Sequence, residues 1–256
     1  MIFYTLKIVL GNFGDVQMKF KNIFFGFLKT WLLVAIFYNG SLYADIYMFL
    51  DLQSYNPEAG NFRPYAFEID PNTGNLVKVF DTQNDFQFKT YNLGSKEDMA
   101  LYEKEVRPTL LEWTEEVKPV QLQSRLSSTF SKNMVEYVDR DFSKGSLSKE
   151  IHVATYKGKI EAMSYADSIE VEKPDIDILV ARPKGLIVGQ TTEPKGGGSS
   201  LLNHVLQRYK EKGIERARLF SVNDDYYRER GWQDDVESNL EFESESEPEF
   251  EYKGCL

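Results

Sequence analysis

The chain has 256 residues, of which 42% are hydrophobic and 27% are charged. This composition is typical of globular proteins and excludes a collagen-like or wholly disordered chain, while the length allows one or two domains. The net charge of −10 makes a nucleic-acid backbone a poor partner. One cysteine and two histidines exclude an intrachain disulfide and argue against a metal centre built from these residues. We therefore expect no nucleic-acid partner and no metal.

Residues 1–44 predict an export signal or a membrane anchor. Two lysines follow Met18, and the apolar run at 23–38 is interrupted by Lys29. This layout resembles a secretory signal peptide, and the run is short for a membrane span of about 20 residues. Cleavage after Ala44 predicts a periplasmic or secreted protein. Failed cleavage would leave a membrane anchor, the one situation in which we expect membrane contact, and a buried helix is the remaining alternative.

Residues 45–95 predict a β-rich N-terminal extension. The segment 45–52 reads as a strand. Two further strands at 64–70 and 75–80 flank the turn Pro-Asn-Thr-Gly at 71–74, which has proline early and glycine last. We expect a hairpin there.

Two helices are predicted next. Ser95 begins the first one as an N-cap, with Asp98 completing a capping box, and apolar residues recur at helical spacing as far as Trp113. Pro108 should kink or divide this helix because proline removes a backbone donor. The second helix spans about 120–138, where large apolar residues step by four and form a core-facing stripe.

Three strands follow the helices. The segments 151–156 and 160–171 alternate around a turn at 157–159, and 175–181 forms a third strand. His152 lies in the first of them, where we interpret it as a strand-face residue, with a catalytic base as the alternative.

A glycine-rich loop then leads into a helix. An apolar stripe at 201–209 has helical spacing, and the loop precedes it directly. Glycines let a backbone approach a ligand, and the N–H groups of a helix N-terminus favour an anion, so a pyrophosphate is the expected ligand. A flexible loop without a ligand is the alternative. The loop lacks the Gly-Lys-Ser/Thr ending of a Walker A motif and the dinucleotide fingerprint. It consists of Lys195, Gly196, Gly197, Gly198, Ser199 and Ser200.

Two further motifs flank the glycine loop. Before it stands Leu-Val-Ala-Arg-Pro at 179–183, and after a strand at 216–222 come Asn223 and then Tyr-Tyr-Arg-Glu-Arg-Gly-Trp at 226–232. This order of motifs resembles the GCN5-related N-acetyltransferases (GNAT). That family has Leu-x-Val-x-Pro before the loop, Gly-x-Gly where this chain has Gly-Gly-Gly at 196–198, and Phe-Tyr-x-x-x-Gly-Phe at the last motif.

The resemblance implies a mixed α/β (α+β) fold at 96–232, with a mostly antiparallel central sheet flanked by helices. It further implies acetyl-CoA as cosubstrate and an amine-bearing small molecule or protein as acceptor. Asn223 would hold a water or the cofactor near the thioester, and Tyr227 would protonate the leaving thiolate. The general base is less defined, and Asp177 is our candidate, with a solvated strand edge as the alternative. The implied cofactor-binding residues are Leu179, Ala181, Lys195, Gly196, Gly197, Gly198, Ser199 and Ser200.

The chain departs from the family pattern in four places. The loop between Pro183 and Gly196 is roughly seven residues longer than usual. Glu193 stands where the family has glutamine or arginine. The segment from Asn223 to Tyr227 is about one helical turn shorter, so Tyr227 could point elsewhere. Further strands are expected after residue 232, but 233–256 is an acidic C-terminal tail whose partial alternation also allows an edge strand.

Three hypotheses about function remain open. The first is an N-acetyltransferase that uses acetyl-CoA and is exported or anchored, for example a bacterial effector, which would reconcile an export signal with a cytosolic cofactor. The second is a catalytically inactive acetyltransferase-like binding module. The third is an unrelated phosphate-binding enzyme that uses the glycine loop.

Overall fold

The computed structural model describes residues 46–58, 62–115, 121–145, 148–236 and 254–255. The chain divides into two compact units, Met1–Ala44 and Asp45–Leu256. The predicted signal or anchor falls in the first unit, outside the described residues. The description below concerns the second unit.

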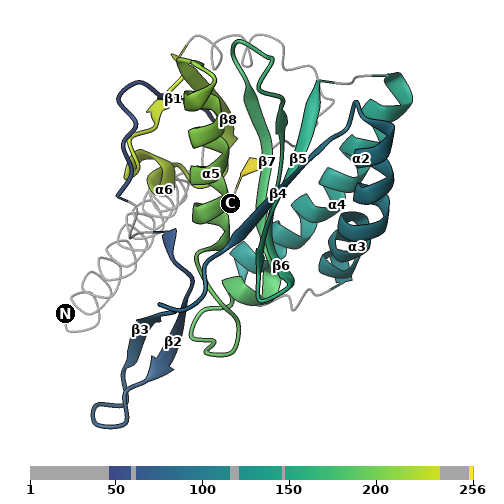
Figure 1. Cartoon of the computed structure of the whole chain (residues 1–256). Helices are drawn as coiled ribbons and strands as arrows, with labels where there is room; N and C mark the ends of the chain where they lie inside the picture. The colour runs from purple at the N-terminus through teal and green to yellow at the C-terminus, as the bar shows by residue number, and fades with distance from the viewer. Residues whose placement is uncertain (1–45, 59–61, 116–120, 146–147, 237–253, 256) are drawn as a thin grey trace, which may run out of the picture. The chain divides into compact units, whose positions relative to one another are not determined.

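A mixed sheet forms the centre of this unit (Figure 1). Within the described residues it has eight strands in the order β4-β5-β6-β7-β10-β8-β1-β9. Neighbouring strands from β4 to β7 are antiparallel, as are β8 with β1 and β1 with β9. The predicted mixed α/β class with a mostly antiparallel sheet is therefore confirmed. The strands are β1 (Ile46–Asp51), β4 (Gln87–Asn92), β5 (Lys149–Tyr156), β6 (Lys159–Asp167), β7 (Asp175–Ala181), β8 (Arg216–Ser221), β9 (Gln233–Asp234) and β10 (Gly254–Cys255).

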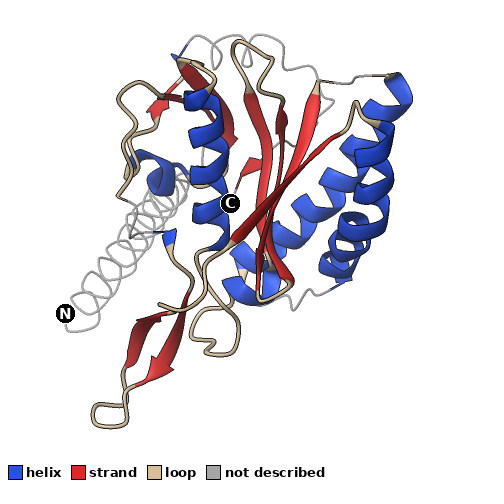
Figure 2. Ribbon diagram, in the orientation of Figure 1, coloured by secondary structure: helices blue, strands red, loops and turns tan. Residues whose placement is uncertain are grey.

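Helices cover both faces of the sheet (Figure 2). On one face, aromatic and aliphatic side chains of α2, α3 and α4 form a core with β5, β6 and β7. On the other face, α5 and α6 form a second core with the same sheet and with β1 and β8. The helices are α2 (Lys96–Leu101), α3 (Arg107–Glu115), α4 (Leu122–Lys144), α5 (Gly197–Glu211) and α6 (Asp224–Arg228). Within the described residues, no helix has the length and apolar character that crossing a bilayer requires.

The predicted first helix is continuous, but one turn of it is wide. Ser95 caps α2, and its hydroxyl accepts from the backbone N–H of Asp98, as predicted. The Asp98 carboxylate does not complete the capping box, because it accepts from the Asn92 N–H at 3.0 Å while the Ser95 N–H donates to the Asn92 carbonyl. A π-helical segment, Tyr102–Val106, then joins α2 to α3. Pro108 is the second residue of α3 and has no N–H to donate, so the wider turn before it removes the clash with the carbonyl four residues earlier. The kink or division of the helix predicted at Pro108 is therefore a π-helical turn just before it.

The N-terminal strands are divided between two sheets. The predicted hairpin forms as β2 (Tyr65–Ile69) and β3 (Leu76–Phe80), which make a separate two-stranded sheet. By contrast β1 and β4, from the same stretch of sequence, belong to the main sheet, at β8 and β5 respectively. The strand that pairs with β8 on this side is thus β1, the first described strand of the chain.

Two short strands follow the motif at 226–232 within the part of the chain that the structure describes. After Trp232, β9 has two residues and pairs with Met48 and Phe49 of β1. The edge strand considered at 239–252 lies outside the described residues. The last strand, β10, pairs with both β7 and β8.

Candidate functional site

The glycine loop forms the start of α5, as predicted. Gly196 is the N-cap and has φ 97°, a left-handed conformation that favours glycine. The backbone N–H of Ser200 donates to the Gly196 carbonyl at 2.9 Å and makes the first helical bond. The N–H groups of the three residues before it, Gly197, Gly198 and Ser199, have no carbonyl to bond within the helix. No described side chain caps this end. It therefore presents backbone donors and a positive dipole to a ligand.

A cavity of about 260 Å³ lies at this helix end, and we call it the glycine-loop cavity. It brings together residues from the loop, from the end of β7 and from the start of α6. Several residues predicted for the site line it, together with the rings of Tyr65 and Tyr226. The predicted residues are Ala181, Lys195, Gly196, Gly197, Gly198, Ser199 and Asn223.

Basic side chains outnumber acidic ones around this cavity. Among the described lining residues the basic side chains are Lys78, Arg182, Lys195 and Arg230, and the acidic one is Glu161. In a chain with a net charge of −10, this local excess of positive charge favours an anionic ligand. The donors of the helix end and the surrounding cations together suit a pyrophosphate group.

Aromatic rings hold two of these cations in place. The Lys78 ammonium lies 3.9 Å from the centre of the Tyr65 ring. The Arg230 guanidinium lies 3.6 Å from the centre of the Tyr226 ring and donates to the Tyr226 carbonyl at 2.7 Å. Burial raises the pKa of the Tyr65 hydroxyl, which therefore stays neutral at physiological pH.

Lys195 stabilises the loop rather than reaching across the cavity. Its ammonium donates to the carbonyls of Gly185 at 2.6 Å and Ile187 at 3.3 Å. Burial lowers the pKa of this ammonium. Its backbone pairs with Tyr65 in both directions, at 3.3 and 2.7 Å, and so attaches the start of β2 to the glycine loop.

The long loop between β7 and α5 is held by its own side chains. The Gln190 amide donates to the Gly185 and Glu193 carbonyls and accepts from the Glu193 N–H at 2.7 Å. Glu193, which stands where the family has glutamine or arginine, lies 3.5 Å from the Arg182 guanidinium. The same guanidinium lies 3.8 Å from Glu161, so Arg182 is shared between two carboxylates.

The two adjacent tyrosines of α6 face in different directions. The Tyr226 hydroxyl lies 2.6 Å from the Ser199 hydroxyl and faces the glycine-loop cavity. Tyr227, the predicted general acid, is 0% exposed and packs edge-on against Tyr226 and Trp232 in the core beneath α5. Tyr227 is not among the described residues that line the glycine-loop cavity. Adjacent residues of a helix point about 100° apart, so one of the two tyrosines faces the cavity while the other faces the core.

Three other predicted residues lie away from the cavity. Asp177 is buried and accepts from Lys149 at 2.5 Å, and Lys149 also pairs with Asp167 at 2.7 Å. Leu179 is buried in the core of the α5 face. The Ser200 hydroxyl donates to the Phe62 carbonyl at 2.5 Å. In this structure all three side chains make structural contacts.

His152 lies on β5 and packs within the protein, in agreement with its interpretation as a strand-face residue. It is buried, with its Nδ1 atom 3.0 Å from the Thr90 hydroxyl and 3.0 Å from the Arg208 guanidinium. Burial and the nearby Arg208 charge lower the pKa of this imidazole well below 6.5. It is therefore neutral in the folded protein at physiological pH.

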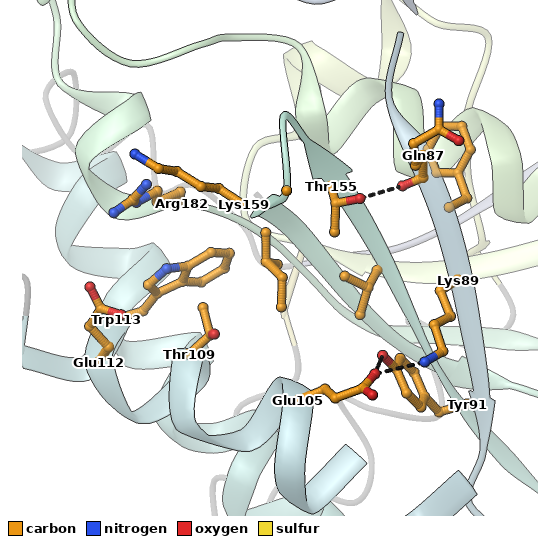
Figure 3. A pocket seen from close by; sticks show the side chains of 14 residues that line it. Gln87, Lys89, Tyr91, Glu105, Thr109, Glu112, Trp113, Thr155, Lys159 and Arg182 are labelled. Carbon is orange, nitrogen blue, oxygen red and sulfur yellow. Dashed lines mark hydrogen bonds and ion pairs between the residues drawn. The ribbon is translucent and has the colours of Figure 1, made fainter. Parts of the chain in front are cut away.

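Two larger cavities lie nearby. One of about 600 Å³ borders α5 and α6 and shares Lys78, Ser199, Tyr226 and Arg230 with the glycine-loop cavity. The other, of about 750 Å³, lies between β4–β6 and α3, where Trp113, Thr109 and Glu112 face Lys159 and Arg182 (Figure 3). In this cavity the Glu105 carboxylate accepts hydrogen bonds from the Lys89 ammonium at 2.7 Å and from the Tyr91 hydroxyl at 2.8 Å. This cavity contains no glycine-rich helix end, although Arg182 lines both it and the glycine-loop cavity.

Comparison with known families agrees with this site. Residues 116–234 match the family model of the acetyltransferase (GNAT) domain, Acetyltransf_9. The chain therefore contains a divergent GNAT domain, as the motifs predicted, and this is an acyltransferase domain. GNAT domains generally use acetyl-CoA as cosubstrate. The matched range includes the glycine loop, Asn223 and both tyrosines of α6.

Two solved proteins with structures similar to this chain have low sequence identity to it. One is the C-terminal DUF2156 domain of an Agrobacterium fabrum protein described as a lysylphosphatidylglycerol synthetase, with 14% identity and a TM-score of 0.39. The match covers 69% of this chain and 46% of that one, so this chain spans less than half of its length. The other is an aminoglycoside acetyltransferase from an uncultured soil metagenomic sample, solved with sisomicin, with 16% identity and a TM-score of 0.32. It is matched over 66% of this chain and 91% of its own. No curated protein matches the sequence significantly.

Proposed function

We propose that the protein is an N-acetyltransferase that moves an acetyl group from acetyl-CoA to an amine of a small molecule or a protein. The observation that carries the proposal is the start of α5, where the N–H groups of Gly197, Gly198 and Ser199 meet a cavity with four basic side chains. Backbone donors and cations in this arrangement suit the pyrophosphate of CoA.

The neighbouring cavity suits the nucleotide end of the same cosubstrate. It shares Ser199 and Arg230 with the glycine-loop cavity, so one ligand can extend through both. The half-buried rings of Tyr55, Phe62 and Tyr226 add aromatic surface on which a base could pack. Burial raises the pKa of the Tyr55 hydroxyl there to about 12, so this group acts as a neutral hydrogen-bond partner.

The transfer needs a neutral amine, a polarised carbonyl and a proton for the departing thiolate. The amine nitrogen bonds to the acyl carbon as the carbon–sulfur bond breaks, and the amine loses a proton. Tyr227 is enclosed by the core, whereas the Tyr226 hydroxyl lies at the cavity. We therefore assign proton donation to Tyr226 in place of Tyr227. Asp177 is paired with Lys149, and this favours removal of the amine proton by water or by a group on the acceptor side.

A second candidate is an acetyltransferase-like module that binds CoA without catalysis. The burial of Tyr227 and the pairing of Asp177 favour it, because two of the three predicted catalytic side chains have structural partners. Binding of acetyl-CoA without release of free thiol in the presence of any amine would select this candidate.

The test is calorimetric titration of the full chain with acetyl-CoA, using wild type, Gly198→Glu and Gly198→Gln. A Cβ at Gly198 would meet the Ala181 Cβ at 3.6 Å, an ordinary contact, so both variants can fold. Glutamine adds bulk to the cavity, and glutamate adds the same bulk with a negative charge. We expect micromolar binding by wild type, weaker binding by Gly198→Gln and none by Gly198→Glu. Equal binding by all three would refute the site.

For localisation we propose that residues 1–44 direct export, with membrane anchoring as the alternative. The supporting feature is the positive start followed by a short apolar run. N-terminal sequencing of the protein recovered from cells distinguishes the two. A new terminus near Asp45 supports export, whereas an intact N-terminus in the membrane fraction supports an anchor, and an intact N-terminus in the cytosolic fraction contradicts both.

A further inference from the structure

Two cations lie where two cavities meet. Lys78 and Arg230 line both the glycine-loop cavity and the cavity of about 600 Å³ beside α5 and α6. Among the described residues that line both cavities none is acidic, since Glu161 lines only the first of the two, and Glu58 and Glu229 line only the second. The junction therefore has a local excess of positive charge, which favours an anionic group at this point.

The β2–β3 hairpin supplies the first cation, Lys78. Its ammonium lies 3.9 Å from the centre of the Tyr65 ring and 4.5 Å from the centre of the Phe80 ring. Within the described residues no carboxylate forms an ion pair with this ammonium, so aromatic rings hold it. The base of the hairpin is attached to the glycine loop, because Tyr65 and Lys195 exchange backbone hydrogen bonds at 2.7 and 3.3 Å. The charge of Lys78 is thus available to an anion at the junction.

The second cation, Arg230, is held by the helix that precedes it. Its guanidinium donates to the Tyr226 carbonyl at 2.7 Å and lies 3.6 Å from the centre of the Tyr226 ring. In the described part of the chain it forms an ion pair with Glu229 at 4.0 Å, and this carboxylate is 78% exposed. A long, exposed pair of this kind contributes little, so the remaining guanidinium donors can bind a phosphate.

The position of the junction indicates which group of CoA reaches it. In the proposed function the pyrophosphate binds at the start of α5, and the base lies in the neighbouring cavity. The ribose joins these two parts of the molecule, and in CoA it carries a phosphate on its 3′ oxygen. A phosphate monoester has a charge of about −1.5 to −2 at pH 7 and three acceptor oxygens. A ligand that extends through both cavities therefore brings the 3′-phosphate to the two cations.

We propose that Lys78 and Arg230 form a second anion site, which binds the 3′-phosphate of CoA and selects CoA over nucleotide ligands that lack this group. The inference rests on the proposed function. It gives a ligand-binding role to a hairpin that lies outside residues 116–234, the range that matches the acetyltransferase domain. Lys78 is thus a specificity-determining residue that this domain receives from the N-terminal extension.

The test compares acetyl-CoA with 3′-dephospho-acetyl-CoA in calorimetric titrations of the full chain. The variants are Lys78→Met and Arg230→Gln, and Lys157→Met is the matched control. Lys157 is also exposed, and its ammonium also lies over a tyrosine ring, 4.8 Å from the centre of Tyr156. It is not among the described residues that line either cavity. Each methionine variant loses one positive charge, so a difference between them does not arise from net charge.

We expect wild type and Lys157→Met to bind acetyl-CoA at least about tenfold more tightly than the dephospho form. Lys78→Met should lose about tenfold in affinity for acetyl-CoA and keep its affinity for the dephospho form, the change expected for one charge-assisted hydrogen bond. Arg230→Gln should lose the same selectivity.

Three results would overturn the inference and leave the proposed function intact. They are equal affinity of wild type for the two ligands, an equal loss for both ligands in Lys78→Met, and the same loss of selectivity in Lys157→Met. Failure of wild type to bind either ligand would overturn the proposed function, and the inference with it.

Discussion

Replacing Gly197 with alanine should destabilise the protein, whereas the same replacement at Gly198 should not. The two residues are neighbours in the first turn of α5 and differ in what surrounds them. A Cβ on Gly197 would lie 3.2 Å from both the Cβ and the carbonyl oxygen of Glu161 on β6. A Cβ on Gly198 would lie 3.6 Å from the Ala181 Cβ, an ordinary van der Waals distance.

The magnitudes follow from two opposing effects. Crowding against a strand backbone in the middle of the sheet costs about 1–3 kcal/mol, because that backbone cannot move freely. Replacing a helical glycine with alanine contributes up to about 1 kcal/mol of stability. For Gly197→Ala the two effects together span a loss of about 0–3 kcal/mol in the free energy of unfolding, with a central value of about 1 kcal/mol. For Gly198→Ala the change lies between zero and a gain of about 1 kcal/mol.

Urea unfolding of the two variants, followed by circular dichroism, measures both values. The reasoning requires that the midpoint falls for Gly197→Ala and does not fall for Gly198→Ala, with equal slopes. A Gly197→Ala variant as stable as wild type, or an equal loss in both variants, would refute the close packing of α5 against β6.

Three further predictions concern side chains near or predicted for the site. Tyr226→Phe should weaken acetyl-CoA binding or slow turnover by about tenfold, whereas Tyr227→Phe should leave both unchanged. Steady-state kinetics compare the two variants, and a larger loss in Tyr227→Phe would restore Tyr227 as the acid. Asp177→Asn should lower the free energy of unfolding by about 2 kcal/mol without changing acetyl-CoA affinity, because Lys149 keeps one of its two carboxylate partners. Loss of turnover in a variant as stable as wild type would instead give Asp177 a catalytic role. The pKa of His152 is lowered in the folded state by burial, so the unfolded chain binds the extra proton and stability should fall as the pH drops below about 6.5, by up to about 1.4 kcal/mol per pH unit. Urea unfolding from pH 7.5 to 5 should show this slope in wild type and a smaller one in His152→Gln, and equal slopes would contradict the buried neutral imidazole.

Local sequence signals predicted most of the elements. The N-cap at Ser95, the turn at 71–74 and the glycine loop before α5 each lie where expected, because short-range chemistry determines them. The same signals identified Gly196–Ser199 and Asn223 as residues that meet at one cavity. Local geometry and the family pattern agree in this region.

Long-range packing determined what the sequence could not reveal. The motif position predicts Tyr227 as the acid, but its ring lies in the core, and the Tyr226 hydroxyl lies 2.6 Å from that of Ser199. No local signal connects Lys78 of β3 with the glycine loop, which lies more than a hundred residues later in the chain. The joining of β1 to β8 has the same origin, since strand pairing between distant segments leaves little trace in a single sequence.

Hydrogen exchange of the full chain with and without acetyl-CoA tests the central claim most directly, because it locates the ligand. Binding at the glycine-loop cavity predicts protection of residues 195–200 and 223–226 and no change at 105–113. Protection confined to 105–113, beside the larger cavity at Trp113, would place the ligand elsewhere and contradict the proposed site.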